Sequence, residues 1–270
     1  MCRMSVLAAT SLLLAAAPLA AHAKDKPKPA PAAAAAQSAR TKASPADRAM
    51  AERLDPLARA AFWARESDVD PQDVQAGLGL SRALRALGKY EEAAAAAERL
   101  RVMAPGQEEV LLEIARAHIG RGQGFYAIEP AQQAAGLAPR DWRPATLLAV
   151  AFEQAQRDDE ALAAHRQALA LGPQVPAVLV NYAMFQAGHG APAEAEKLLR
   201  TAAALPGAGA QVRQNLALVI GLQGRFDEAE RLARQDLPPE LVASNMAFLR
   251  AAAAGGTTSA RSWEALRATP

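Results

Sequence analysis

The chain has 270 residues, enough for one extended domain or two compact ones. Hydrophobic residues make up 51% of it and aromatic residues only 4%. Ala and Leu supply most of the apolar content, and because both are strong helix formers, the composition favours packed helices over sheets. The net charge is +2, but six basic residues and one acidic residue lie in the first 46 positions, so the rest is mildly acidic. An acidic body lacks the positive field that holds a polyanion, which argues against nucleic-acid binding.

The N-terminus has the pattern of a secretory signal peptide. Arg3 supplies a positive charge, residues 6–20 form an apolar run, and residues 21–23 (AHA) fit a small-x-small cleavage site. We therefore predict a signal peptide over 1–23, cleavage before Lys24 and a periplasmic mature protein. An uncut membrane anchor is the alternative, although the run is short of the ~20 apolar residues that a spanning helix needs.

The single cysteine, Cys2, precedes the apolar run, so it supports neither lipid attachment at the cleavage junction nor a disulfide framework or cysteine-based zinc site in the mature protein. Residues 24–46 combine Lys-Pro repeats with a run of Ala and lack large apolar side chains. We predict a flexible Pro/Ala/Lys linker there. Its positive charge leaves a peripheral association with the outer membrane open.

A period of 34 residues organises the rest of the chain. One position of this repeat, here called the turn position, holds four glycines and one glutamine: Gly88, Gly122, Gln156, Gly190 and Gly224. Five residues later, at the contact position, stands an alanine each time: Ala93, Ala127, Ala161, Ala195 and Ala229. Glycine can adopt the left-handed conformation that ends a helix, and alanine lets two helices approach closely. Prolines with the same period (71, 105, 139 and 173) stop each second helix.

A 34-residue helix–turn–helix period is typical of tetratricopeptide repeats. We therefore predict an all-α fold, a tetratricopeptide-like right-handed solenoid of antiparallel helix pairs with terminal capping helices, over 71–254. The predicted units are 74–107, 108–141, 142–175, 176–209 and 210–239, followed by a cap helix. Residues 47–70 are a predicted N-terminal capping helix that Pro56 kinks or divides. Residues 255–270 are a predicted C-terminal tail, either loosely docked or packed back on the end through Trp263 and Leu266.

A second motif marks the first helices of the last three units, where Asn-x-Ala recurs at residues 181–183, 215–217 and 245–247. Together with the stretches 212–218 (VRQNLAL), 224–230 (GRFDEAE) and 138–143 (APRDWR), it resembles the TadD family of tight-adherence (Flp) pilus assembly proteins. The resemblance implies an accessory protein near the outer membrane that helps to assemble or localise a secretin pore. Family members often carry a lipid anchor, and the cysteine for it is missing here.

In such a solenoid the first helix of each unit lines the concave face. The side chains that we predict to bind a protein partner there are Arg82, Arg85, Arg116, Asn181, Met184, Asn215, Leu218 and Asn245. This face is basic at its N-terminal end and apolar further along, which suits an amphipathic peptide with acidic residues. Two alternatives stay open: the arginines are ordinary solvated charges, and the asparagines bond neighbouring helices instead of the amides of an extended ligand.

Enzymatic function is disfavoured, since no phosphate-binding loop, nucleophile elbow or zinc-binding helix motif occurs. His118, His165 and His189 lack cysteine or carboxylate partners at metal spacing, and His165 is predicted to be solvated. We expect no cofactor, no metal and no small-molecule substrate. The prediction is a non-enzymatic periplasmic protein–protein interaction scaffold, assisting a tight-adherence pilus and secretin machine. The alternative is a periplasmic adaptor that recruits an envelope enzyme system, for cell-wall or cytochrome maturation.

Overall fold

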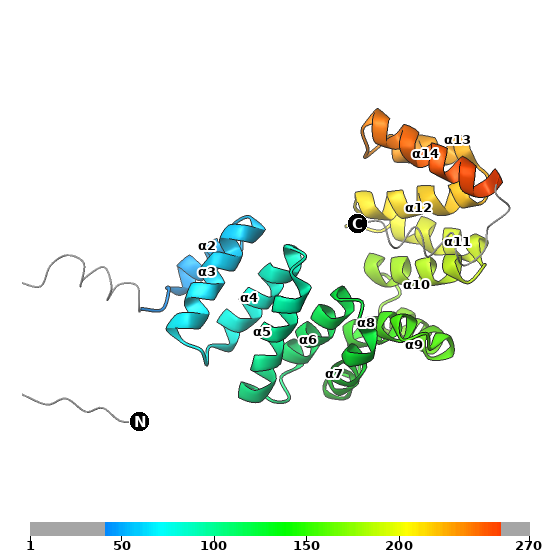
Figure 1. The fold of residues 1–270 in the computed structure, drawn as a ribbon. Coiled ribbons are helices and arrows are strands. Elements are labelled where there is room, and N and C mark those ends of the chain that lie inside the picture. The colour runs from blue at the N-terminus through cyan, green and yellow to red at the C-terminus, as the bar shows by residue number, and fades with distance from the viewer. Residues whose placement is uncertain (1–40, 255–270) are drawn as a thin grey trace, which may run out of the picture. The chain divides into compact units, whose positions relative to one another are not determined.

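The computed structural model describes residues 41–254 of the chain, and the predicted signal peptide lies outside them. Residues 42–254 belong to one compact unit. Residues 41–254 form thirteen helices and no strand (Figure 1). This all-α architecture is the predicted fold class. The helices are α2 (Pro45–Ala51), α3 (Pro56–Val69), α4 (Val74–Ala86), α5 (Tyr90–Met103), α6 (Glu108–Gly120), α7 (Gly124–Leu137), α8 (Trp142–Gln154), α9 (Asp158–Leu171), α10 (Pro176–Gly188), α11 (Pro192–Ala203), α12 (Ala210–Leu222), α13 (Phe226–Ala233) and α14 (Pro239–Ala254).

Helix pairs repeat along the chain as the 34-residue period predicts. The first helices of the five units, α4, α6, α8, α10 and α12, begin at the first residue of each predicted unit. Each packs on the second helix that follows it and on the next first helix. The last helix, α14, packs on α12 and α13. The result is a row of stacked helix pairs in which each pair buries its apolar face against its neighbours.

The N-terminal helices are held to the first unit by a buried ion cluster. The carboxylate of Glu66 on α3 is fully buried and accepts hydrogen bonds from Arg48 of α2 (2.8 Å) and from the backbone N–H of Ala43 (3.0 Å). Arg48 also bonds Asp73, which caps the N-terminus of α4. The α2 helix begins at Pro45, inside the range predicted as linker, because Ser44 caps it. Pro56 is the first residue of α3.

The turn position has left-handed backbone in every unit. The four glycines there have φ between 69° and 82°, and Gln156 has φ 57°. Each turn is closed by the same bond, in which the N–H of the following residue donates to a carbonyl five residues back, as from Arg157 to Phe152 (2.9 Å). This is the bond pattern that ends a helix at a left-handed residue. The turn in the third unit therefore forms without the glycine that would relieve its strain.

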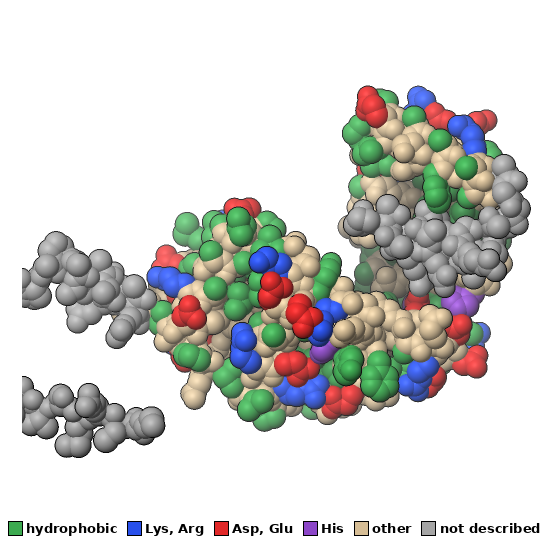
Figure 2. Space-filling view, in the orientation of Figure 1, with side chains coloured by type: hydrophobic (Ala, Val, Ile, Leu, Met, Phe, Trp, Pro, Cys, Tyr) green, Lys and Arg blue, Asp and Glu red, His purple; other side chains and the backbone are tan. Residues whose placement is uncertain are grey.

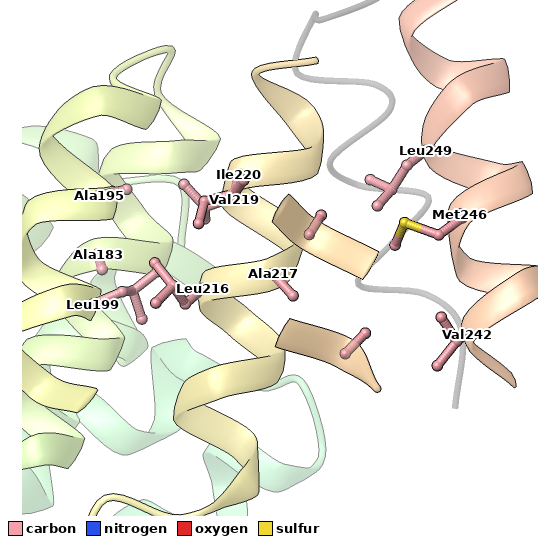
Figure 3. Packing of buried hydrophobic residues seen from close by; sticks show 12 residues of the cluster. Ala183, Ala195, Leu199, Leu216, Ala217, Val219, Ile220, Val242, Met246 and Leu249 are labelled. Atoms are coloured by element: carbon pink, nitrogen blue, oxygen red, sulfur yellow. The ribbon is translucent and has the colours of Figure 1, made fainter. Parts of the chain in front are cut away.

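The contact position is the centre of each helix pair. All five alanines at this position are fully buried. In the C-terminal cluster, Ala195 lies beside Ala183, Leu199 and Leu216 (Figure 3). For Ala94, the next residue, the sequence predicts an exposed position on the outer face of its helix, and this prediction is wrong, since Ala94 is only 2% exposed. It is buried because α5 is covered on two sides, so Ala94 clusters with Ala117 of α6 as well as with Leu84 of α4.

Candidate functional site

The first-helix face, formed by the exposed sides of α4, α6, α8, α10, α12 and α14, carries all of the predicted site residues. Its N-terminal part is centred on Glu113 of α6, whose side chain is fully buried. Arg85 donates two hydrogen bonds to this carboxylate (2.9 and 3.3 Å), and the Ser81 hydroxyl lies 3.1 Å from it. Arg82 and Arg116 lie 3.8 Å from it. A buried carboxylate thus joins three arginines of two successive units.

A second group of carboxylates extends this network to α8. Glu109 accepts from Arg82 (3.1 Å) and from Arg143, which also bonds Glu108 (2.8 Å) and Asp141 (2.6 Å). The hydrogen bond that Arg143 donates to Glu109 raises the pKa of the Arg143 guanidinium against the effect of burial. Burial lowers the pKa of Arg116, and the charge of Glu113 opposes that effect. The three predicted arginines are therefore partly exposed, and each has a carboxylate partner. Figure 2 shows basic and acidic side chains interspersed on the visible N-terminal helices.

The sequence reasoning missed these pairs, although a signal for them exists. Residues 28 apart lie across from one another on successive units, and three Arg–Glu pairs have this spacing: Arg85–Glu113, Arg101–Glu129 and Arg200–Glu228. The first pair joins two first helices, and the other two pairs join second helices. A spacing of 28 residues therefore identifies side chains that face each other across successive units on either face of the repeats.

The C-terminal part of the face contains a cavity of about 410 Å³ between α12, α13 and α14. Asn215 and Leu218 line it from α12, and Asn245 and Phe248 line it from α14. Its floor is apolar, with Met246 and Leu249 pointing from α14 toward Ala217 (Figure 3). The structure thus brings three predicted site residues, Asn215, Leu218 and Asn245, to one cavity. Asn181 and Met184, which are half-buried on α10, do not line it.

The three asparagine side chains share one property. None of the amide groups of Asn181, Asn215 and Asn245 hydrogen-bonds to another residue within 41–254. The alternative in which each asparagine bonds a neighbouring helix therefore finds no partner among the described residues. An asparagine amide offers two donors and an acceptor, all of which are left for solvent or a ligand.

Two of the histidines are buried beside carboxylates, which the sequence did not predict. His165 was expected to be solvated, but it is 1% exposed, because the α9 face that carries it packs against α8 and α10. Its Nε2 lies 2.7 Å from Glu153, and its ring stacks on Tyr182. His118 is buried with its Nε2 3.1 Å from Glu98. Each histidine thus has one carboxylate, and residues 41–254 hold no group of three or more side chains arranged to bind a metal.

No helix between residues 41 and 254 combines the length and apolarity that crossing a membrane requires.

Comparison with known proteins supports the repeat assignment directly. The sequence model of the tetratricopeptide repeat matches residues 146–177, which span the turn at Gln156. The helix pairs of residues 74–233 have the fold of stacked tetratricopeptide repeats.

Solved structures with this repeat resemble the chain over most of its length. A tetratricopeptide protein from the thermophile Thermus thermophilus is 25% identical, with a TM-score of 0.58 over 65% of this chain and 97% of that one. One from Parabacteroides merdae is 12% identical, with a TM-score of 0.63 over 77% of this chain and 86% of that one. No curated protein matches the sequence. The repeats imply protein partners in general, and the resemblance to the TadD family gains no support from these comparisons.

Proposed function

We propose that this protein is a non-enzymatic interaction scaffold that binds an extended segment of a partner protein on the C-terminal part of its first-helix face. The observation that carries the proposal is the row of unpaired asparagine amides beside an apolar cavity. An extended peptide exposes backbone donors and acceptors along its length, which asparagine side chains can pair with. The apolar floor would accept a large apolar side chain of the same segment.

The N-terminal part of the face contributes less to the proposed binding site. Its arginines are already paired with Glu109 and Glu113, so an acidic ligand would have to compete with fixed carboxylates. Arg116 is the exception, because its one ion pair within 41–254 is the long contact of 3.8 Å to Glu113, and it donates no hydrogen bond to a described residue. An acidic residue at one end of the bound segment would complete the pairing of Arg116.

For the cellular setting, we propose export to the periplasm and a role in assembling or localising the secretin of a tight-adherence pilus. The signal-peptide pattern supports export, and the Asn-x-Ala and APRDWR stretches support the pilus assignment. Mass spectrometry of the protein from its own bacterium tests the first point. We expect a mature N-terminus at Lys24 without lipid, and an intact Met1 would contradict it.

Affinity capture of envelope proteins tests the partner. We expect a secretin or a pilus-assembly protein to be retained by the mature chain and retained less by the Asn181→Ala/Asn215→Ala variant. Each lost pair of hydrogen bonds should weaken binding by ~1–3 kcal/mol, or roughly tenfold to a hundredfold. Gln167→Ala, an exposed amide on α9, is the matched control and should bind as wild type.

The capture has two informative failures. If a cell-wall or cytochrome-maturation enzyme is retained instead, the adaptor function replaces the pilus role and the binding site stands. If the double asparagine variant binds every partner normally while folded, the proposed site is wrong.

A further inference from the structure

The last helix of the structure differs from every earlier first helix. Each of α4, α6, α8, α10 and α12 is followed by a second helix that packs along it, whereas α14 is the last helix within 41–254. One side of α14 is buried on α12 and α13 through Val242, Met246 and Leu249. Elsewhere on this helix Leu241 is 52% exposed and Phe248 is 44% exposed. A large aromatic side chain beside an open apolar cavity marks a surface that a further element covers.

The sequence after α14 has the composition of such an element. Gly255 and Gly256 follow the helix directly, at the place where Gly224 follows α12. Glycine permits the left-handed turn that reverses the chain after a helix. Beyond them come Trp263 and Leu266, three residues apart, a spacing that puts both on one side of a helix. The sequence of the segment therefore predicts a turn followed by a short amphipathic stretch.

The length of the segment lets it return to the cavity. Phe248 lies six residues before the end of α14, which corresponds to ~9 Å along a helix. Trp263 lies nine residues beyond that end, and nine residues can span up to ~30 Å. A cavity of about 410 Å³ is large enough for the indole, since pockets that enclose whole small ligands begin at ~300 Å³. The Asn215 and Asn245 amides on its rim would meet the polar atoms of the entering backbone.

We propose that residues 255–270 fold back on α14 and insert Trp263 into the cavity between α12 and α14. The segment then occupies the site that the proposed function assigns to the partner, so it is a built-in competitor. Because it is tethered, its effective concentration at the cavity is on the order of millimolar, and a partner has to displace it. The competition rests on the proposed function, whereas the docking of Trp263 does not.

Tryptophan fluorescence of the full mature chain tests the docking. The difference between the wild-type and Trp263→Phe spectra isolates the emission of Trp263 from that of Trp63 on α3 and Trp142 on α8. We expect the Trp263 emission to be blue-shifted and several-fold less quenched by acrylamide than that of a synthetic peptide of residues 255–270. Leu218→Glu, which puts a charge in the cavity, should make Trp263 resemble the free peptide.

The control is Leu241→Glu, an exposed position on α14 that does not line the cavity, which should leave Trp263 protected. Circular dichroism and the emission of Trp63, which is buried at the other end of the repeats, check that each variant is folded. Wild-type Trp263 that is quenched like the free peptide, or protection that survives Leu218→Glu, would overturn the proposal. Protection that is lost on about a hundredfold dilution would assign the cavity to a second copy of the chain and overturn it too.

Partner affinity then tests the competition. With the captured partner, Trp263→Ala should bind ~tenfold tighter than wild type, because the competing segment no longer fills the site. Unchanged affinity with a protected Trp263 would overturn the competition and leave the docking in place. If no partner is ever captured, the proposed function fails while the fluorescence result still decides the docking.

Discussion

The N-terminal and C-terminal parts of the first-helix face use the same repeat positions in opposite ways. Glu113, Asn181 and Asn215 occupy one position, separated by multiples of 34 residues, and Arg82, Arg116, Met184 and Leu218 occupy another. In the N-terminal part both positions are charged, and Glu113 pairs with Arg82 of the preceding unit and with Arg116 of its own helix. In the C-terminal part the same positions carry unpaired amides and apolar side chains beside a cavity.

The N-terminal part of this face stabilises the fold, and the C-terminal part is the one that we propose binds a partner. A buried carboxylate shared among arginines ties neighbouring units together, and removing it leaves charges without partners. An amide without a partner contributes little to folding but keeps its donors and acceptors for a ligand. The C-terminal units do contain cross-unit ion pairs: Arg200–Glu228 joins two second helices, and Arg250 of α14 lies 3.7 Å from Glu230 of α13. None of the described residues that line the cavity takes part in them.

The largest expected effect is the loss of Glu113. Glu113→Ala should destabilise the protein by ~2–4 kcal/mol, somewhat less than for fully buried pairs because the arginines around it are partly exposed. Asn215→Ala, at the same repeat position, should cost under ~0.5 kcal/mol because it breaks no bond within the described residues. Urea unfolding of both variants measures the difference. Equal costs would mean that the two parts of the face do not differ as described.

Packing at the contact position should be equally important in both parts. Ala161→Leu should cost ~1–3 kcal/mol, because the added methyl groups find no space where α9 meets α8. Ala163→Leu on the exposed side of the same helix is the matched control and should change the stability little. Thermal melting compares them. A similar loss of stability in both variants would mean that Ala161 does not mark the side of α9 that packs on α8.

Glu196 on α11 provides a pH-dependent test of the second-helix ion pairs. The hydrogen bond from Arg225 lowers its pKa from 4.5 to about 2, against the opposing effect of burial. Its contribution to stability is therefore present above pH 4.5 and is lost as the pH falls toward 2. Glu196→Gln should cost ~1–2 kcal/mol at neutral pH, a value discounted because Arg225 and Arg200 are partly exposed.

The cost of Glu196→Gln should shrink as the pH falls below 4.5 and should be mostly lost near pH 2, where half of the wild-type carboxyl groups are protonated in the folded protein. Urea unfolding at a series of pH values measures it. A cost that does not change with pH would show that the amide disturbs packing and that the ion pairs contribute nothing.

The smallest expected effect is a gain in stability at the turn of the third unit. Gln156→Gly should stabilise the protein by ~0.5–1 kcal/mol, since a left-handed backbone strains any residue with a Cβ atom. Gly190→Gln is the reciprocal change, and it should destabilise by a similar amount because a Cβ there meets no neighbour and only the backbone conformation is tested. Thermal melting checks both signs. A loss on Gln156→Gly would mean that the glutamine side chain, which bonds the Glu153 carbonyl, stabilises the turn.

The helix pairs and their boundaries were determined by the sequence alone. Gly, Ala and Pro act on the backbone within a few residues of where they stand, so a period in these residues is a period in structure, and even Gln156 obeys it. The tertiary structure decided which side chains meet across units. Glu113 is buried between arginines, His165 faces Glu153, and Ala94 is covered by α6, because each depends on a neighbour brought close only by stacking. The cavity at Asn215 and Asn245 likewise arises from how α14 packs on α12, and the distance between these two helices cannot be read from a local pattern of residues.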